Sequence, residues 1–87
     1  MNKVDIFCDI ISEKNRSFID TKDAVNVLII NQSSNAIFIN RIVIPALTER
    51  NFYAGDGCVF QRNFDLDTAQ NTASSVDIYV VKTKIVG

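Results

Sequence analysis

Residues 25–30 read VNVLII and residues 36–44 read AIFINRIVI, with only the polar link NQSSN at 31–35 between them. Both segments are rich in Val and Ile, which predicts two consecutive β-strands. Successive side chains of a strand point to opposite faces, so a strand with one wet face should alternate apolar and polar residues. These two segments are instead apolar on both faces.

In the first segment, Val25, Val27 and Ile29 share one face, and Leu28 and Ile30 share the other. The second segment, taken as one continuous strand, has the faces Phe38, Ile42, Ile44 and Ile37, Ile39, Val43. A chain of 87 residues has material for about two packed layers. One apolar face can form the core, so the second face needs another cover, which we expect to be another copy of the chain or another protein.

The second face defines a candidate interface. Arginine beside apolar area is a common composition of interface hot spots, and Arg41 lies in the middle of the second segment. The predicted interface residues are Leu28, Ile30, Ile37, Ile39, Arg41 and Val43. The polar stretch from Asp67 to Ser75 is a second, weaker candidate for contact with a partner, because loops carry recognition in sandwiches.

The rest of the chain supplies further short strands. Apolar residues at Val4, Ile6, Cys8 and Ile10 recur with period two and favour a strand, although the same stretch also has apolar residues at helical spacing. Further strands are expected at Ser17–Asp20, at Glu49–Ala54 with Phe52 pointing inward, at Cys58–Leu66, and at Val76–Val86 with a β-bulge near Val80–Val81.

Turn residues separate these strands. Pro45 should end the second central segment, because proline cannot donate to a strand ladder. Gly55-Asp56-Gly57 predicts a tight turn, since both glycines can adopt positive φ. Six or seven short strands with regular turn signals predict one all-β domain over residues 1–87, an antiparallel β-sandwich or small barrel.

Composition argues against several classes of partner. The net charge is −1, from 9 basic and 10 acidic residues that are scattered along the chain, so nucleic acid is not an expected partner. No apolar run approaches the ~20 residues of a membrane helix. Asp5 and Asp9 interrupt what would be the apolar part of a signal peptide, so we expect a soluble, unsecreted chain.

Catalytic chemistry finds little support. The chain has no histidine, which removes the commonest general base and metal ligand. Asp65 and Asp67 share one face of a strand; a carboxylate pair or Ca²⁺ site is the alternative to a solvated strand end, but calcium needs six to eight oxygens. We therefore predict a protein that is not an enzyme, with no catalytic residue, metal or cofactor.

The two cysteines, Cys8 and Cys58, are fifty positions apart. We expect two free thiols buried on inward faces, as is typical of a reducing compartment. A disulfide that closes this long loop is the alternative, and would stabilise the fold by about 4 kcal/mol in the chain-entropy model.

The run Ile39-Asn40-Arg41-Ile42-Val43-Ile44-Pro45, preceded by a strand and the NQSSN link, resembles small β-sandwich virion proteins of tailed bacteriophages, including phages of gut Bacteroidales. The resemblance covers about residues 25–67, with Phe60 to Asp67 as the later acidic, aromatic strand. The relatives place a Pro-Gly turn where this chain has Pro45-Ala46-Leu47.

The resemblance implies a structural protein of the auxiliary capsid or head decoration type. Its expected partners are the major capsid protein, other virion proteins or copies of itself, and its expected location is the virion, after synthesis in the host cytoplasm. Two alternatives stay open. One is a carbohydrate-binding sandwich, which would need exposed aromatic rings, in a chain without Trp. The other is an intracellular protein inhibitor of an enzyme.

Overall fold

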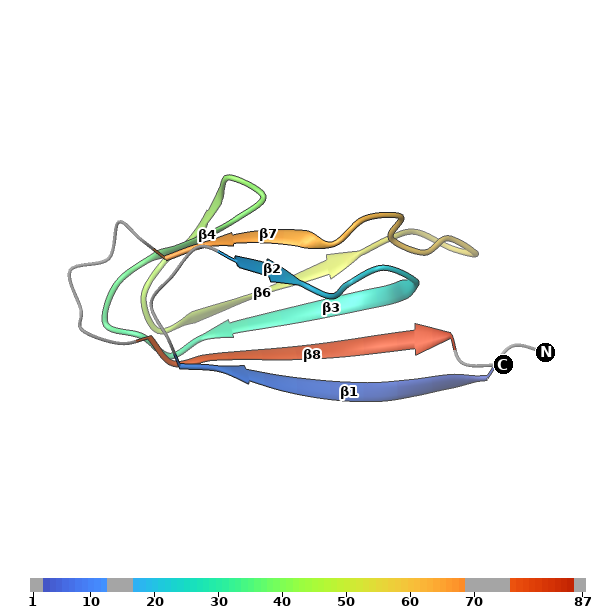
Figure 1. The fold of residues 1–87 in the computed structure, drawn as a ribbon, viewed down its shortest axis with the longest axis horizontal. Helices are drawn as coiled ribbons and strands as arrows, with labels where there is room; N and C mark the ends of the chain where they lie inside the picture. The colour runs from blue at the N-terminus through green and yellow to red at the C-terminus, as the bar shows by residue number, and fades with distance from the viewer. Residues whose placement is uncertain (1–2, 13–16, 69–75, 86–87) are drawn as a thin grey trace.

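A computed structural model describes residues 3–12, 17–68 and 76–85. Every regular element in these residues is a β-strand, so the predicted all-β class is confirmed, with eight strands instead of six or seven (Figure 1). The strands are β1 (Val4–Ile11), β2 (Ser17–Ile19), β3 (Ala24–Asn31), β4 (Ile37–Ile39), β5 (Ile42–Ile44), β6 (Thr48–Tyr53), β7 (Phe64–Asp67) and β8 (Ile78–Ile85).

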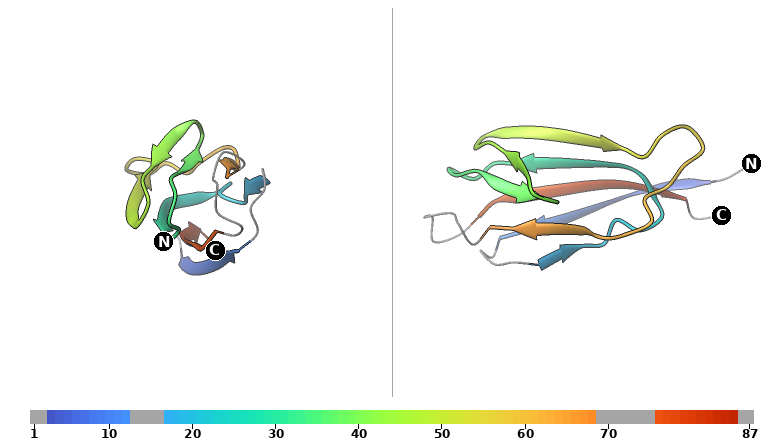
Figure 2. Two further views of the ribbon diagram at one scale, coloured as in Figure 1. Left: turned by 90° about the vertical axis from the view of Figure 1, so that its left-hand side faces the viewer. Right: turned by 90° about the horizontal axis from the view of Figure 1, so that it is seen from above.

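The strands form two four-stranded antiparallel sheets, which pack on each other as a sandwich. The order in sheet A is β1-β8-β3-β6, and the order in sheet B is β2-β7-β4-β5. The sheets approach each other where β5 lies beside β6, whereas β1 forms the opposite edge of sheet A (Figure 2). The molecule is elongated along its strands, with extents of 45 × 20 × 20 Å.

The core fills the space between the two sheets. In β3, Val27 and Ile29 are fully buried, while Leu28 and Ile30 between them are half-buried on the other face. This alternation is the one that the sequence predicts. The buried apolar residues are Ile19, Ala24, Val27, Ile29, Ile37, Ile39, Ile44, Phe64, Leu66, Val76, Ile78 and Val80.

The second central segment is a hairpin, and its prediction as one continuous strand is wrong. Residues 37–39 and 42–44 form β4 and β5, joined by a two-residue turn at Asn40 and Arg41. Both turn residues have positive φ, 50° and 68°, as two-residue hairpin loops of type I′ require. Asparagine tolerates that conformation well, and its Oδ1 here accepts the N–H of Asp65 at 2.8 Å.

Reversal of the chain at this turn redistributes the side chains. Ile37 pairs with Ile44 and is buried with it in the core, and Ile39 is buried beside them. Phe38 pairs with Val43 on the opposite face, where Val43 is exposed. The predicted apolar face with Ile37, Ile39 and Val43 together therefore does not exist.

Two further predictions need correction. Of the expected strand Cys58–Leu66, only the end from Phe64 is a strand, because residues 58–63 form an irregular connection. No bulge occurs at Val80–Val81, since the pairing of β1 with β8 is regular throughout. The pairing of β8 with β3 does have a register shift, which lies between Ala24 and Asn26 of β3.

Other predictions are confirmed. Residues 4–11 are a strand and not a helix, β2 forms at Ser17, and β5 ends immediately before Pro45. Phe52 of β6 packs against the core. Gly55 and Gly57 have positive φ of 112° and 71°, and the N–H of Cys58 donates to the carbonyl of Gly55 at 3.0 Å to close the turn.

Asn31 fixes the end of β3 to the neighbouring connections. Its side chain is fully buried, and its Nδ2 donates to the carbonyls of Asn35, Ile44 and Pro45 at 3.0 to 3.1 Å. Its Oδ1 accepts the N–H of Ser33 at 3.0 Å. One buried amide thus joins sheet A to the hairpin of sheet B.

The described residues contain no helix long and apolar enough to pass through a membrane.

Candidate functional site

Sheet A carries an apolar surface on the side that faces away from the core. In β8 the inward residues are Ile78, Val80, Lys82 and Lys84, so the residues between them point outward. The pairing of β8 with β1 and β3 places the outward residues of these strands beside them. We call this set the outer apolar face: Val4, Ile6, Cys8 and Ile10 of β1, Tyr79, Val81, Thr83 and Ile85 of β8, and Leu28 and Ile30 of β3.

Exposure on the outer apolar face is greatest at the edge of the sheet. Ile6 and Ile10 of β1 each expose 66% of their surface and Val4 exposes 56%, whereas the residues of β3 and β8 are half-buried. Towards β6 the surface becomes polar: Asn26 and Asn51 exchange amide hydrogen bonds of 2.8 Å, and Glu49 follows. The apolar area is therefore bordered by polar residues towards β6 and by the free edge of the sheet at β1.

β1 is also uncovered on its inward side. Phe7, which pairs with Lys82 of β8, remains 41% exposed because sheet B does not extend over this strand. Figure 1 shows β1 along one edge of the molecule, beside β8. A strand of eight residues thus shows both of its faces and one backbone edge to solvent.

Two lysines line the space between the sheets next to β1. Nζ of Lys82 lies 2.6 Å from Oδ2 of Asp9, and Nζ of Lys84 lies 3.1 Å from Oδ2 of Asp20. Lys82 is almost fully buried, whereas Asp9 is half exposed. These ion pairs occupy the inward face where the apolar core ends.

The structure divides the predicted interface residues into three groups. Leu28 and Ile30 lie on the outer apolar face of sheet A, as expected for a second face that needs cover. Ile37 and Ile39 are fully buried in the core, so their assignment to an interface is wrong. Arg41 and Val43 lie on the β4–β5 hairpin of sheet B and belong to a different part of the surface.

Sequence reasoning missed the contribution of β1 and β8 to this surface. The signal was present, because Val4, Ile6, Cys8 and Ile10 recur with period two. That period shows that they share a face but not whether the face is inward. Only the pairing of β1 with the outward residues of β8 decides this point.

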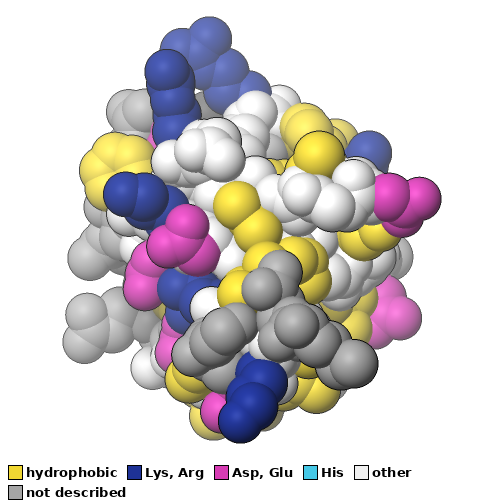
Figure 3. Space-filling view, turned by 90° about the vertical axis from the view of Figure 1, so that its right-hand side faces the viewer, with side chains coloured by type: hydrophobic (Ala, Val, Ile, Leu, Met, Phe, Trp, Pro, Cys, Tyr) yellow, Lys and Arg dark blue, Asp and Glu magenta, His cyan; other side chains and the backbone are white. Residues whose placement is uncertain are grey.

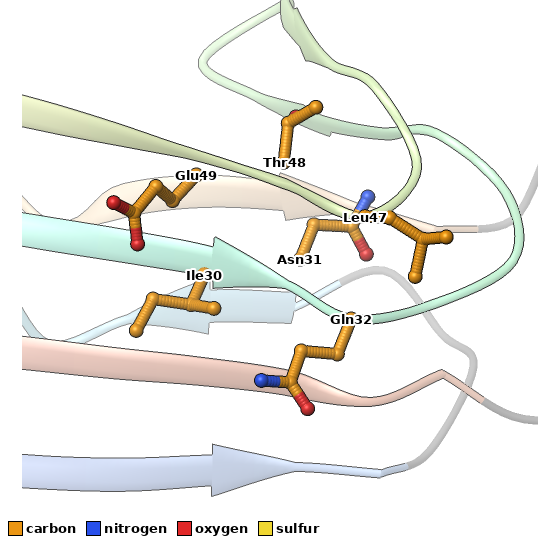
Figure 4. Close-up of a pocket in the computed structure, with 6 residues that line it drawn as sticks. All are labelled: Ile30, Asn31, Gln32, Leu47, Thr48 and Glu49. Carbon is orange, nitrogen blue, oxygen red and sulfur yellow. The ribbon is translucent and has the colours of Figure 1, made fainter.

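Shallow hollows, each with a volume of about 410 Å³, lie at two places on the surface of the described residues, and the first of them borders the outer apolar face at Ile30. The first lies at the end of β3, where the connection from β5 to β6 passes (Figure 4). Its rim includes Leu47, which is 75% exposed and has a φ of 60°, a conformation that favours glycine. This open hollow has two large apolar side chains, those of Ile30 and Leu47, and its other lining residues are polar: Asn31, Gln32, Thr48 and Glu49.

The second hollow lies over an aromatic cluster. Phe64 makes edge-to-face contacts with Phe52 and Phe60, with ring centroids 5.2 and 4.9 Å apart. The polar side chains at its rim are Asn40, Gln61, Arg62 and Asn63. Phe64 is buried and the other two rings are half-buried, so the rings stabilise the core and do not form an exposed stacking platform.

Tyr53 lies at the surface and has a perturbed pKa. The hydroxyl of Tyr53 donates a hydrogen bond to Oδ1 of Asp56. This hydrogen bond raises the pKa of Tyr53 above 10.0, and partial desolvation and the negative charge of Asp56 act in the same direction. The pair lies in the turn after β6, and the nearby Cys58 also acts on Tyr53 in the same direction.

The described residues hold no group of three or more His, Cys, Asp or Glu side chains that could bind a metal. Asp65 and Asp67 share one face of β7, as predicted from their spacing, and this face points away from the core. Cys8 and Cys58 are free thiols, but both are exposed, so the prediction of buried thiols is wrong. Cys8 points outward on β1 and Cys58 lies in the turn after β6.

Charged side chains of both signs are present at the end of the molecule that Figure 3 shows. Figure 3 shows basic and acidic groups there next to one another, with hydrophobic groups between them.

Comparison with protein-family models, with curated proteins and with solved structures found no match to this chain.

Proposed function

We propose that this protein is a structural assembly subunit that acts through protein–protein contacts and is not an enzyme. The observation that carries the proposal is the outer apolar face, which extends over three strands and is most exposed at β1. Soluble monomers rarely expose contiguous apolar patches of more than a few hundred Å², and larger patches mark interaction sites. The burial of this face against another protein would supply hydrophobic free energy at about 25 cal/mol per Å² of apolar surface.

The concrete form that we propose is an auxiliary capsid or head decoration subunit of a tailed bacteriophage. The resemblance of residues 25–67 to such virion proteins suggests this form, and a chain without histidine accords with a binding role. The partners would then be the major capsid protein, other virion proteins or further copies of the chain, and the site of action would be the virion.

Incorporation into a particle tests the proposal. The wild-type chain and the variants Ile6→Lys and Ile10→Lys, each with an affinity tag, are produced during infection, and purified particles are examined by quantitative mass spectrometry. We expect the wild type in particles at a fixed copy number, and at least a tenfold lower content of both variants. Circular dichroism and thermal unfolding establish that the variants fold, which is expected because both side chains are already exposed.

A matched control places the same change elsewhere. Phe18 of β2 is 74% exposed on sheet B, so Phe18→Lys alters an exposed apolar residue outside the outer apolar face. This variant should be incorporated like the wild type. Absence of the wild-type chain from particles contradicts the virion role, and selective loss of Phe18→Lys shows that the outer apolar face is the wrong surface.

A further inference from the structure

We infer that β1 pairs edge to edge with β1 of a second copy of this chain, in an antiparallel register centred on Cys8. This inference rests on the proposed function, because it names the first partner of the assembly surface. It joins two copies of sheet A into one eight-stranded sheet.

The four edge strands of the two sheets differ in length and in composition. An exposed strand edge can pair with other chains, and proteins usually protect it by shortness or by charge. The edges of sheet B, β2 and β5, have three residues each. The other edge of sheet A, β6, carries the polar run Thr48-Glu49-Arg50-Asn51. β1 alone among these four edges is both long, with eight residues, and rich in exposed Val, Ile and Phe.

The hydrogen-bond pattern of sheet A determines which backbone groups lie at the free edge of β1. The N–H of Gln32 donates to the carbonyl of Asp77, at the residue pair next to the end of the β3–β8 ladder. Hydrogen-bonded pairs alternate along an antiparallel ladder, so Tyr79 and Val81 bond to β3, and their neighbours in β8 bond to β1. The backbone groups of alternate β1 residues remain at the free edge: Val4, Ile6, Cys8 and Ile10.

An independent contact agrees with this assignment. The N–H of Ile6 donates to Oδ1 of Asp5 at 2.9 Å, which a strand residue with its N–H at an open edge can do. Among the described residues, no other strand pairs with this side of β1. The edge therefore offers a row of N–H and C=O groups with the spacing of a strand ladder.

The free edge of β1 suits a second copy of β1 in one particular register. Two antiparallel copies of a strand are related by a two-fold axis perpendicular to the sheet, so each residue meets a residue of the same face. With the axis at Cys8, Ile6 lies opposite Ile10 of the second copy, which brings together the two most exposed residues of the outer apolar face. Asp5 then lies opposite Ile11, and Phe7 lies opposite Asp9, which is already paired with Lys82.

The neighbouring registers are unfavourable. An axis at Phe7 places Asp5 opposite Asp9 of the second copy, twice in each dimer, and an axis at Asp9 places the two Asp9 carboxylates opposite each other. Like charges directly opposite each other destabilise a strand pair. Larger shifts leave fewer residues paired. The register centred on Cys8 pairs residues 5–11 of β1 with the same residues of the second copy without directly opposed charges, and it makes the outer apolar face continuous across both copies.

Proline substitution tests the edge without removing a bond within the monomer. Cys8→Pro removes an N–H that points to the free edge, a position at which edge strands tolerate proline. The matched control is Glu49→Pro in β6. The N–H of Ala54 donates to Val25 of β3, so alternation along this ladder leaves the N–H of Glu49 at the other free edge of sheet A. The dissociation constant of the dimer is measured for both variants and for the wild type by sedimentation velocity, under reducing conditions and over a range of concentrations. Circular dichroism establishes that the variants fold.

We expect a wild-type dimer, a dissociation constant at least tenfold higher for Cys8→Pro, and no such change for Glu49→Pro. A wild type that remains a monomer throughout overturns the inference, while the proposed function is still judged by incorporation into particles. A wild-type dimer that Cys8→Pro leaves intact also overturns it, and shows self-association through another surface, such as packing of two outer apolar faces.

The register has a separate test in a Cys58→Ser background, which leaves Cys8 as the single thiol. A short bifunctional thiol reagent should link two Cys8 residues into a covalent dimer. In the same background, a protein with both Cys8→Ser and Ile6→Cys should not form a covalent dimer. Position 6 of one copy would lie opposite position 10 of the other, four residues away from its own counterpart. Efficient linkage of the Ile6→Cys protein and none through Cys8 would overturn the register centred on Cys8.

Discussion

Lys82 of β8 forms an ion pair with Asp9 of β1, with Nζ 2.6 Å from Oδ2, although the lysine side chain is only 6% exposed. Asp9 lies one diagonal step from Lys82 on the inward face, since Lys82 pairs directly with Phe7. The pair therefore fixes the edge strand to its neighbour at the point where the apolar core ends. Because Asp9 is half exposed, its desolvation cost is modest, whereas the ammonium group is held away from bulk water.

We predict that loss of the carboxylate of Asp9 is more harmful than loss of the ammonium group of Lys82. Asp9→Asn leaves a buried ammonium without its counter-charge, which should lower the free energy of unfolding by about 1 to 2 kcal/mol. Lys82→Met fills a similar volume without a charge and should cost less. Urea unfolding of both variants measures the difference. Equal stability of Asp9→Asn and wild type would show that the pair contributes nothing to the fold.

Asn31 should be among the polar residues that are most sensitive to substitution. Asn31→Ala leaves the carbonyls of Ile44 and Pro45 without their buried donor, and the expected loss of stability is about 2 to 3 kcal/mol. Asn51→Ala removes an exposed amide pair with Asn26 and should cost well under about 1 kcal/mol. Thermal and denaturant unfolding of the two variants compares them directly. Similar losses at both positions would contradict the role assigned to Asn31.

The hairpin turn offers a prediction of the opposite sign. Arg41 has a φ of 68°, and an L-residue in this region carries a strain of roughly 1 to 2 kcal/mol that glycine does not. Arg41→Gly should therefore raise the free energy of unfolding by up to about 1 kcal/mol, since glycine also gains freedom in the unfolded chain. Arg41→Ala is the matched control, because it removes the same charge but retains the strain. A stabilisation shared by both variants would assign the effect to the charge.

The same control variant tests the earlier hypothesis for Arg41. If the guanidinium group anchors a partner, Arg41→Ala should weaken assembly by at least ~1 kcal/mol without a change in fold. The structure places Arg41 on sheet B, away from the outer apolar face, so assembly through sheet A alone predicts no effect. The second candidate for contact with a partner, the stretch from Asp67 to Ser75, lies largely outside the described residues.

Local patterns in the sequence were sufficient for most of the strands and for much of the core. β3 alternates as predicted, because Val27 and Ile29 are buried while Leu28 and Ile30 point outward. Proline and glycine also marked strand ends correctly, at Pro45 and at the turn of residues 55–57. These features depend on neighbours in the chain, which is the information that period and turn chemistry contain.

The hairpin at Asn40 was missed because its turn lacks the usual glycine. An Asn-Arg pair between Ile residues reads equally well as part of a strand, and only the antiparallel pairing of Ile39 with Ile42 reveals the reversal. The reversal moved Ile37 and Ile39 into the core and removed them from the candidate interface. In the same way, the exposure of β1 depends on its position at the edge of sheet A, which strand order determines and local sequence does not.

Tyr53 provides a prediction on pH. Its hydroxyl donates to the carboxylate of Asp56, which stabilises the protonated phenol and raises its pKa above 10.0. A group with a raised pKa in the folded state contributes stability that is fully present below the unfolded value, about 10, and is lost as pH rises through the folded value. The native protein should thus lose this contribution above about pH 10, and Tyr53→Phe should abolish that part of the dependence. Absorbance titration at the phenolate band, with Tyr53→Phe to identify the contribution of Tyr79, follows the group, and Asp56→Ala should return the pKa of Tyr53 towards 10.0. An unchanged titration of Tyr53 in Asp56→Ala would show that the hydrogen bond does not form in solution.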